Sequence, residues 1–262
     1  MLKISVTKYG EVSPFIADKI LAAISECYRV IGEPIAESVD LCIIEKATGE
    51  VFFATHDALS GKPRITIYVD KFLEMPELIG LAGIRRQAAH SVLHGSLEYY
   101  LIKFPQELIK AMRQYNLAQG YADNLLYGTG MAVKEYEVSK LLHEKNFVED
   151  QIAYARYILD PSNDEALAWK LVSRNSLEKI LYLVSIIRDI SCAMPLTQDE
   201  QFEDEVKNHI EEKLAHIAPA YRARIQKILY EKFLLLDANT LENIDLLTKF
   251  VVEDIVDPEL ST

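Results

Sequence analysis

The sequence predicts an α+β protein in which a small sheet comes first and helices follow. Runs rich in β-branched and aromatic residues, with apolar and polar positions alternating, all precede residue 70. From Phe104 onward, apolar residues recur at helical spacing almost without a break. We therefore expect an N-terminal part made of the sheet, one helix and a long histidine-bearing helix, followed by a mainly α-helical C-terminal half.

The elements of the N-terminal part are placed by their start and stop signals. Ser13-Pro14 is typical of a helix start, and Gly32 ends the apolar face that follows. Strands are expected at residues 2–6, 40–45, 51–54 and 64–69. Because Ala47-Thr48-Gly49 separates the second and third of these runs, the pattern indicates a hairpin between them.

Helix signals divide the C-terminal half. Pro105 opens a helix, and Gly128-Thr129-Gly130 predicts a break before the helix of residues 131–146. Capping boxes predict further helix starts at Ser162/Glu165, Asn175/Glu178 and Thr197/Glu200. The most apolar helix, residues 176–193, is expected at the centre of this half, with Val184 and Ile187 buried. The charge pattern changes after Pro195, so we expect a core of residues 1–195 and a helical segment of residues 196–262.

Composition excludes several classes of function. The net charge is -12 and the pI is about 5.0, which disfavours binding to nucleic acid or to anionic lipid. No apolar run has the length of a membrane span or a signal peptide. Cys27, Cys42 and Cys192 are isolated in apolar surroundings and are expected to be buried thiols. We therefore expect a cytoplasmic protein that binds neither nucleic acid nor a membrane.

Residues 78–100 form the helical pattern on which the functional prediction depends. One face is apolar, and the opposite face carries a polar stripe made of Arg86, Gln87, His90, His94 and Glu98. Side chains four residues apart on a helix point the same way, so His90 and His94 can offer two imidazoles to one metal ion.

This stretch resembles the active-site helix of zincin metallopeptidases, in which HExxH supplies two zinc ligands and a glutamate base. In one register, His90 and His94 keep the ligand positions, but Ser91 replaces the base. In the register that we favour, residues 86–90 align with HExxH and Leu93-His94-Gly95 with the following Leu-His-Gly. Arg86 then replaces the first ligand and Gln87 replaces the base, so the resemblance implies the shape of a peptidase helix without its chemistry.

A metal would need a further ligand from another helix, because His90 and Glu98 start about 12 Å apart along the helix axis. Glu135 is the first candidate, since it shares a face with apolar residues, and Glu137 is the second. Glu135 could instead pair with Arg86 where a zinc ion once sat, which is the interpretation that we favour. No cofactor is therefore expected, with zinc as the alternative. His56 is expected to be an exposed turn histidine, although a ligand or base reaching the site from a loop is the functional alternative.

Three functions follow from these observations. The favoured hypothesis is a zincin-fold protein that has lost peptidase activity and binds a protein or peptide in the former substrate groove, with Arg86, Gln87 and Glu98 lining the site. The second is a zinc-dependent hydrolase that uses His90, His94 and a carboxylate from a later helix. The third is a helical scaffold protein without an active site.

Overall fold

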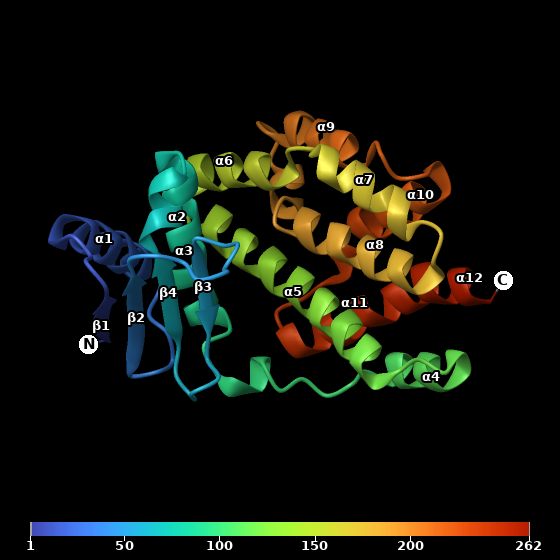
Figure 1. The fold of residues 1–262 in the computed structure, drawn as a ribbon, viewed down its shortest axis with the longest axis horizontal. Coiled ribbons are helices and arrows are strands. Elements are labelled where there is room, and N and C mark those ends of the chain that lie inside the picture. The colour runs from blue at the N-terminus through green and yellow to red at the C-terminus, as the bar shows by residue number, and fades with distance from the viewer. Residues whose placement is uncertain (1, 262) are drawn as a thin grey trace. The chain divides into compact units, whose positions relative to one another are not determined.

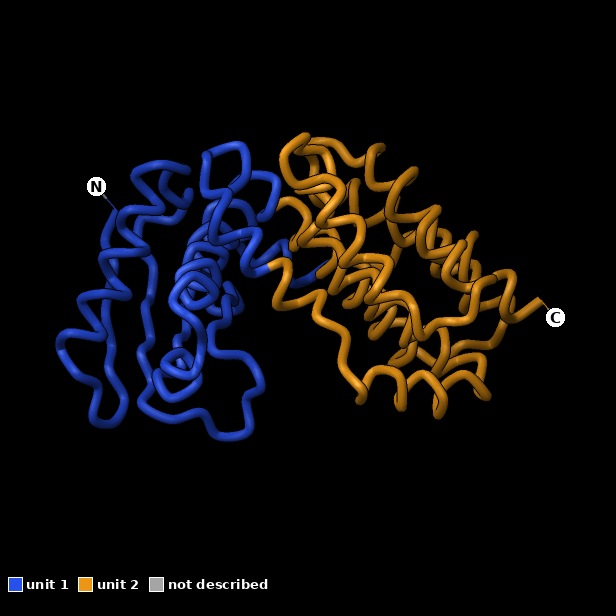
Figure 2. The backbone as a smooth tube through the Cα atoms, turned by 90° about the horizontal axis from the view of Figure 1, so that it is seen from above, with its two compact units in different colours: residues 1–102, 138–154 blue, residues 103–137, 155–262 orange. Residues whose placement is uncertain are grey.

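The computed structural model describes residues 2–261 and divides them into two compact units (Figure 2). Unit 1 contains the residues up to 102 together with residues 138–154, and unit 2 contains residues 103–137 together with those from 155 onward. All four strands lie in unit 1, which confirms the α+β class. The boundary expected between residues 195 and 196 falls inside unit 2 and stays a prediction.

The sheet of unit 1 has the strand order β1-β2-β4-β3 (Figure 1). Its strands are β1 (Lys3–Tyr9), β2 (Ser38–Ile44), β3 (Ala54–Asp57) and β4 (Arg64–Tyr68). The first three strands in this spatial order run parallel, with Leu41 beside Val6 on one side and Ile65 on the other. β3 runs antiparallel to β4, with His56 opposite Ile65, and is the terminal strand of the sheet.

The expected hairpin between residues 40–45 and 51–54 is wrong. β2 pairs with β1 and β4, and β3 starts only at Ala54. Backbone bonds explain why the chain does not turn back after β2: Glu45 donates its N–H to the carbonyl oxygen of Tyr9 and accepts one from Asp70. The carboxylate of Asp70 also accepts the N–H of Ala47 at 3.1 Å. The segment after β2 is thereby tied to the neighbouring elements, and β4 takes the place beside β2.

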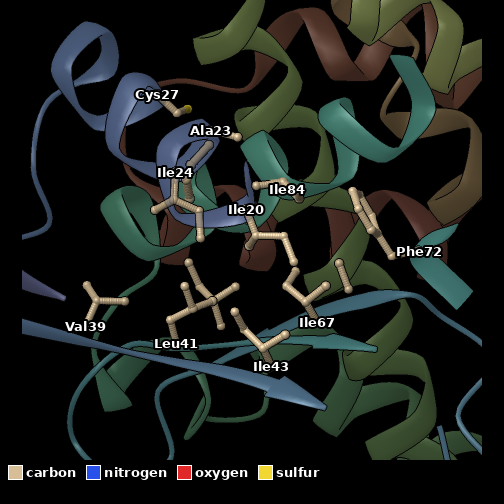
Figure 3. Close-up of a cluster of buried hydrophobic side chains, with 14 of the residues drawn as sticks. Ile20, Ala23, Ile24, Cys27, Val39, Leu41, Ile43, Ile67, Phe72 and Ile84 are labelled. Carbon is tan, nitrogen blue, oxygen red and sulfur yellow. The ribbon is translucent and has the colours of Figure 1, made fainter. Parts of the chain in front are cut away.

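Two helices cover one face of this sheet: α1 (Pro14–Ile31) and α3 (Glu77–Leu93), with the short α2 (Val69–Glu74) between β4 and α3. Figure 3 shows Ile20 and Ile24 of α1 and Ile84 of α3 directed toward β2 and β4. On β2 the buried side chains alternate with half-buried ones, as expected for a strand with one covered face. The buried apolar residues of these elements form one core cluster, which also includes Val138 and Leu142.

Small residues let α3 approach its neighbours. A Cβ added at Gly83 would lie 2.1 Å from Cζ of Phe53, and one added at Gly80 would lie 2.9 Å from Cε2 of Phe72. Real side chains cannot come so close, so both positions need glycine for this packing. The helix is therefore held close to the sheet, which positions its polar residues beside β3 and β4.

Unit 2 is built from helices, two of which it shares along the chain with unit 1. These are α5 (Gln119–Glu144), whose residues up to 137 belong to unit 2, and α6 (Val148–Leu159), whose residues from 155 do. The others are α4 (Gln106–Tyr115), α7 (Asn163–Val172), α8 (Ser176–Ser191), α9 (Glu203–Leu214), α10 (Pro219–Lys227), α11 (Thr240–Val251) and α12 (Asp257–Leu260). Val184 and Ile187 of α8 are buried as predicted. None of the helices in residues 2–261 combines the length and the hydrophobicity that a bilayer crossing requires.

The predicted break at Gly128-Thr129-Gly130 is wrong, because α5 runs through it. Gly128 is instead a packing residue: a Cβ there would lie 2.5 Å from Cγ1 of Val184. The hydroxyl of Thr129 contacts the carbonyl oxygen of Leu125 at 3.1 Å and the hydroxyl of Thr248 at 2.8 Å. Glycine in this helix therefore marks a close contact between helices and not a helix end.

Two of the three predicted helix caps are found. Ser162 and Glu165 form the reciprocal capping box, and the Asn175 side chain accepts the N–H groups of residues 177 and 178. The box expected at Thr197 and Glu200 is wrong. Thr197 lies in a 3₁₀ turn, Met194–Gln198, where its hydroxyl donates to the carbonyl oxygen of Met194 at 2.7 Å. Among the cysteines, Cys27 and Cys192 are buried as expected, whereas Cys42 is partly exposed.

Candidate functional site

The helix that carries the predicted site is shorter than expected. α3 ends at Leu93, and His94 is its C-cap, whose N–H donates to the carbonyl oxygen of His90 at 2.7 Å. The chain then turns at Gly95, where a Cβ would lie 2.1 Å from the carbonyl oxygen of Ser91. Glu98 consequently lies in a separate 3₁₀ turn, is exposed, and accepts a hydrogen bond from the hydroxyl of Ser96 at 3.0 Å.

The two histidines are brought together as the sequence predicts. His90 and His94 are 5% and 0% exposed, and their Nδ1 atoms are 3.2 Å apart. In a hydrogen bond between two neutral imidazoles, one nitrogen donates and the other accepts. Two nitrogen ligands at about 2.05 Å from one tetrahedral zinc ion are about 3.3 Å apart, so the same spacing also suits a shared metal ion.

His56 joins this pair, and its expected place in an exposed turn is wrong. It lies half-buried in β3, with its ring stacked on that of His90 at 6.0 Å between centroids and 12° between planes. The hydroxyl of Tyr100 is 2.8 Å from Nδ1 of His56, and the ring of Tyr99 meets that of His94 edge-on at 5.5 Å. We call these five residues the histidine cluster.

Two features of the histidine cluster bear on its chemistry. Burial raises the pKa of Tyr100 above its ordinary value, so its phenol remains protonated near neutral pH. The rings of His56 and His90 are nearly parallel, and parallel stacked rings do not direct their nitrogens to one point. Within residues 2–261, no group of three or more His, Cys, Asp or Glu side chains has the arrangement of a metal site.

The two predicted carboxylate ligands belong to unit 2. Both oxygens of Glu137 accept hydrogen bonds inside that unit, one from the Thr240 hydroxyl at 2.8 Å and one from the Asn243 amide at 2.7 Å. Glu137 is therefore held as a helix-bridging acceptor. The assignment of Glu135, as a metal ligand or as the partner of Arg86, stays a prediction.

Arg86 lies at the position of the first metal ligand in the favoured register. Its side chain is buried among residues of unit 1. It is 1% exposed, and its Nη1 donates to the hydroxyl of Ser139 at 2.6 Å and to Oε1 of Gln151 at 3.0 Å. Its guanidinium lies over the ring of Tyr154, 4.7 Å from the centroid. A permanently charged group in this position cannot coordinate a cation. Gln87, which stands where the base would be, is half-buried at the next helix position.

The other register places Ser91 at the position of the base, and the structure gives this residue a different role. Ser91 is 1% exposed, and its hydroxyl donates to the carbonyl oxygen of Ala88 at 2.6 Å. The same hydroxyl is 2.6 Å from that of Tyr28 on α1, whose pKa burial raises above its ordinary value. Ser91 therefore joins α3 to α1, and its proton is already donated within α3.

Arg85, the neighbour of Arg86, has a separate set of partners. Its guanidinium contacts the carboxylates of Asp150 at 2.9 Å and Glu26 at 3.1 Å and lies over the ring of Phe147. Burial raises the pKa of Asp150, against the effect of the Arg85 charge. The two arginines thus have different partners, and only Arg86 falls at a motif position in the register that the sequence favours.

Comparison with known proteins finds no matching family model, no curated relative and no similar solved structure. The zincin resemblance consequently depends on residues 86–95. It stays a prediction.

Proposed function

We propose that this chain is a zincin-type protein that has lost peptidase chemistry and binds a peptide beside the histidine cluster. The observation that carries the proposal is the position of Arg86 and the hydrogen bonds that hold its side chain there. Its hydrogen bonds to Ser139 and Gln151 fix a guanidinium where the favoured register needs an imidazole ligand. With Gln87 in place of the carboxylate base, hydrolysis lacks both a complete ligand set and a base.

The neighbouring strand supports binding of an extended peptide. β3 is the terminal strand of the sheet, carries His56 and packs against α3. A peptide can add to a sheet edge through main-chain hydrogen bonds, while its side chains fill pockets beside the strand. The histidine cluster would then provide hydrogen-bond donors and acceptors for such a peptide.

The first experiment asks whether the motif can be restored. We expect the double variant Arg86→His with Gln87→Glu to bind one zinc ion per chain, because it recreates HExxH with His90. Metal content after reconstitution and dialysis measures this. The matched control is Arg85→His with Gln87→Glu, which puts the new imidazole on a helix position that cannot face His90. A restored variant that is folded and binds no more zinc than the control would contradict the zincin ancestry.

The second experiment tests whether the chain has lost peptidase activity and whether it binds peptides. The unaltered chain is expected to retain labelled extended peptides from pooled libraries without cleaving them, with or without added zinc. Cleavage that depends on metal and disappears in His90→Ala would contradict the proposal, and so would a library from which no peptide binds at concentrations up to about 1 mM.

A second function is favoured by one distance, the 3.2 Å between Nδ1 of His90 and Nδ1 of His94. Because this spacing suits two ligands on one zinc ion, a metallohydrolase that uses these two imidazoles and a further carboxylate is the alternative proposal. Protein purified without chelator would then contain close to one equivalent of metal, which His94→Ala would remove. Metal that stays substoichiometric after reconstitution would exclude this alternative.

A further inference from the structure

Unit 2 contains a pocket of about 470 Å³ that is lined by residues of this unit alone. Its volume is in the range of small-molecule sites, roughly 300–1,000 Å³. The walls are largely apolar and aromatic: Tyr136 and Phe233, whose rings meet edge-on at 5.2 Å, together with Leu229 and Met194. These four side chains are each at least nine-tenths buried. The pocket is therefore a preformed apolar space.

A local change of helix type shapes one wall. After α10 the chain forms a π-helical turn, Ile228–Lys232, and then a 3₁₀ turn, Phe233–Leu235. Such turns change the number of residues per turn and redirect side chains, and π turns are frequent at functional sites. Leu229, Tyr230, Phe233 and Leu234 all line the pocket as a result.

The rim carries one charge of each sign. Lys207 and Glu211 lie four residues apart on α9, so both side chains are on one face of the helix. Lys207 also contacts the partly exposed Glu203, and Glu211 accepts a hydrogen bond from Gln226 at 2.6 Å. Exposed polar pairs of this kind are weak, so both rim charges can turn to a ligand. Burial, aided by Glu211, raises the pKa of Tyr230 to about 12 and keeps its phenol neutral.

We propose that this pocket binds a short apolar peptide of about two residues as a zwitterion. Its terminal carboxylate would contact Lys207, its terminal ammonium would contact Glu211, and its side chains would pack against Tyr136 and Phe233. The site lies in unit 2 and does not depend on the function proposed for the histidine cluster.

The spacing of the two rim residues along α9 is compatible with this class of ligand. Cβ atoms four residues apart on a helix are separated by about 5–6 Å. An extended chain spans about 3.3–3.6 Å per residue, so the termini of a dipeptide are separated by about 7 Å, whereas a free amino acid spans about half of that. A purely anionic ligand would be attracted by Lys207 but repelled by Glu211, and a purely cationic one the reverse, so neither gains from both charges. A short peptide with both charges complements the rim.

The test is calorimetric titration of the full chain with the dipeptide Leu-Phe and with its N-acetyl and C-amide derivatives. We expect the free dipeptide to bind and each blocked derivative to bind about tenfold more weakly, because each lacks one charge. Lys207→Gln should weaken binding of the free dipeptide but not of the C-amide, and Glu211→Gln should do so for the free dipeptide but not for the N-acetyl form. The matched control is Glu212→Gln, an exposed neighbour on α9 outside the pocket lining, which should change nothing.

The experiment also distinguishes the pocket of unit 2 from the histidine cluster of unit 1. His90→Ala is expected to leave binding of the dipeptide unchanged, so failure of either proposal does not affect the other. Equal affinity for the free and blocked dipeptides, tighter binding of the single amino acids, or no binding of the free dipeptide would overturn the inference. Because the substituted side chains lie at the rim, circular dichroism of the variants should match that of the unaltered chain.

Discussion

Arg86 is a buried charged residue whose position in the candidate site is set by its hydrogen-bonding partners. A charged side chain that is removed from water requires hydrogen-bonding partners, and Ser139 and Gln151 supply two of them from segments far along the chain. Lysine would be a poor replacement, because its compact ammonium cannot lie flat over the ring of Tyr154 as the planar guanidinium does. The guanidinium of Arg86 is therefore part of the packing of unit 1 and not an isolated group at the surface.

His216 is a residue at which burial is expected to make stability depend on pH. It is half-buried, its Nε2 lies 2.7 Å from the hydroxyl of Tyr182, and burial lowers its pKa below the ordinary value of 6.5. Between the lowered folded pKa and 6.5, the unfolded chain binds more protons than the folded one, so the free energy of unfolding falls as the pH drops through this window.

We expect His216→Gln to reduce that acid-side loss of stability while keeping a hydrogen-bonding group beside Tyr182. Urea unfolding of both proteins from about pH 5 to about pH 8 measures the difference, since this range brackets histidine titration. At the upper end both side chains are neutral, and the two curves should differ by a constant. Equal slopes at the acidic end would contradict the assignment.

At the scale of elements, α5 offers a matched pair of glycines. A Cβ at Gly128 would lie 2.5 Å from Cγ1 of Val184, whereas one at Gly120 would have no neighbour within 4 Å. We expect Gly128→Ala to lower the free energy of unfolding by about 1–3 kcal/mol, because overpacking against α8 exceeds the gain in helix propensity. Gly120→Ala should raise it by a few tenths of a kcal/mol up to about 1 kcal/mol. Denaturant midpoints measure both, and two effects of the same sign would contradict this account.

The elements that could be predicted from the sequence are those whose signals are local. The Ser13-Pro14 start of α1, the alternating residues of β4 and the apolar face of α8 depend on their own segments and are found as expected. The pairing of β2 could not be predicted in this way, since it depends on bonds to Tyr9 and Asp70 that lie far away along the chain. The glycine contact of α5 with Val184 is of the same kind.

The same distinction between local and long-range signals applies to the residues of the candidate site. Proximity of His90 and His94 follows from helical spacing, and it is found. His56 stacks on His90 from another element, so its place could be predicted only with the strand set correctly at residues 54–57. Within this strand Ala54 and His56 share a face, a period-2 pattern that is too short to stand out in the sequence.

At the scale of the whole molecule, each unit is completed by residues that are distant in sequence. Residues 138–154 return to unit 1 after the intervening segment, and Val138 and Leu142 join its core cluster. The same segment provides Ser139 and Gln151 to Arg86 and Asp150 to Arg85. The N-terminal sheet and its helices therefore depend on a later part of the chain for both apolar cover and polar partners.

In unit 2, the last helix, α12, is likewise held by residues that are distant in sequence. Oε1 of Glu259 accepts hydrogen bonds from Nζ of Lys179 at 2.5 Å and from the hydroxyl of Ser176 at 2.8 Å, and Oε2 accepts one from the hydroxyl of Tyr221 at 2.7 Å. Burial opposes ionisation of this carboxyl, but its hydrogen bonds hold the pKa of Glu259 below the ordinary value. The side chains of Lys179 and Glu259 are only 10% and 9% exposed, so little solvent competes for their charges.

We therefore expect Glu259→Gln to lower the free energy of unfolding by about 2–4 kcal/mol, because the nearly isosteric amide leaves the charge of Lys179 without its anion. Glu253→Gln is the matched control, since Glu253 is about half exposed in its pair with Lys249 and should contribute less than about 0.5 kcal/mol. The loss in Glu259→Gln should also shrink as the pH falls through the lowered folded pKa of this carboxyl, because protonation removes the same charge from the unaltered chain. Urea unfolding at neutral and acidic pH measures both effects. Equal stability of the two variants, or a loss that does not change with pH, would show that shape and not charge holds the last helix in place.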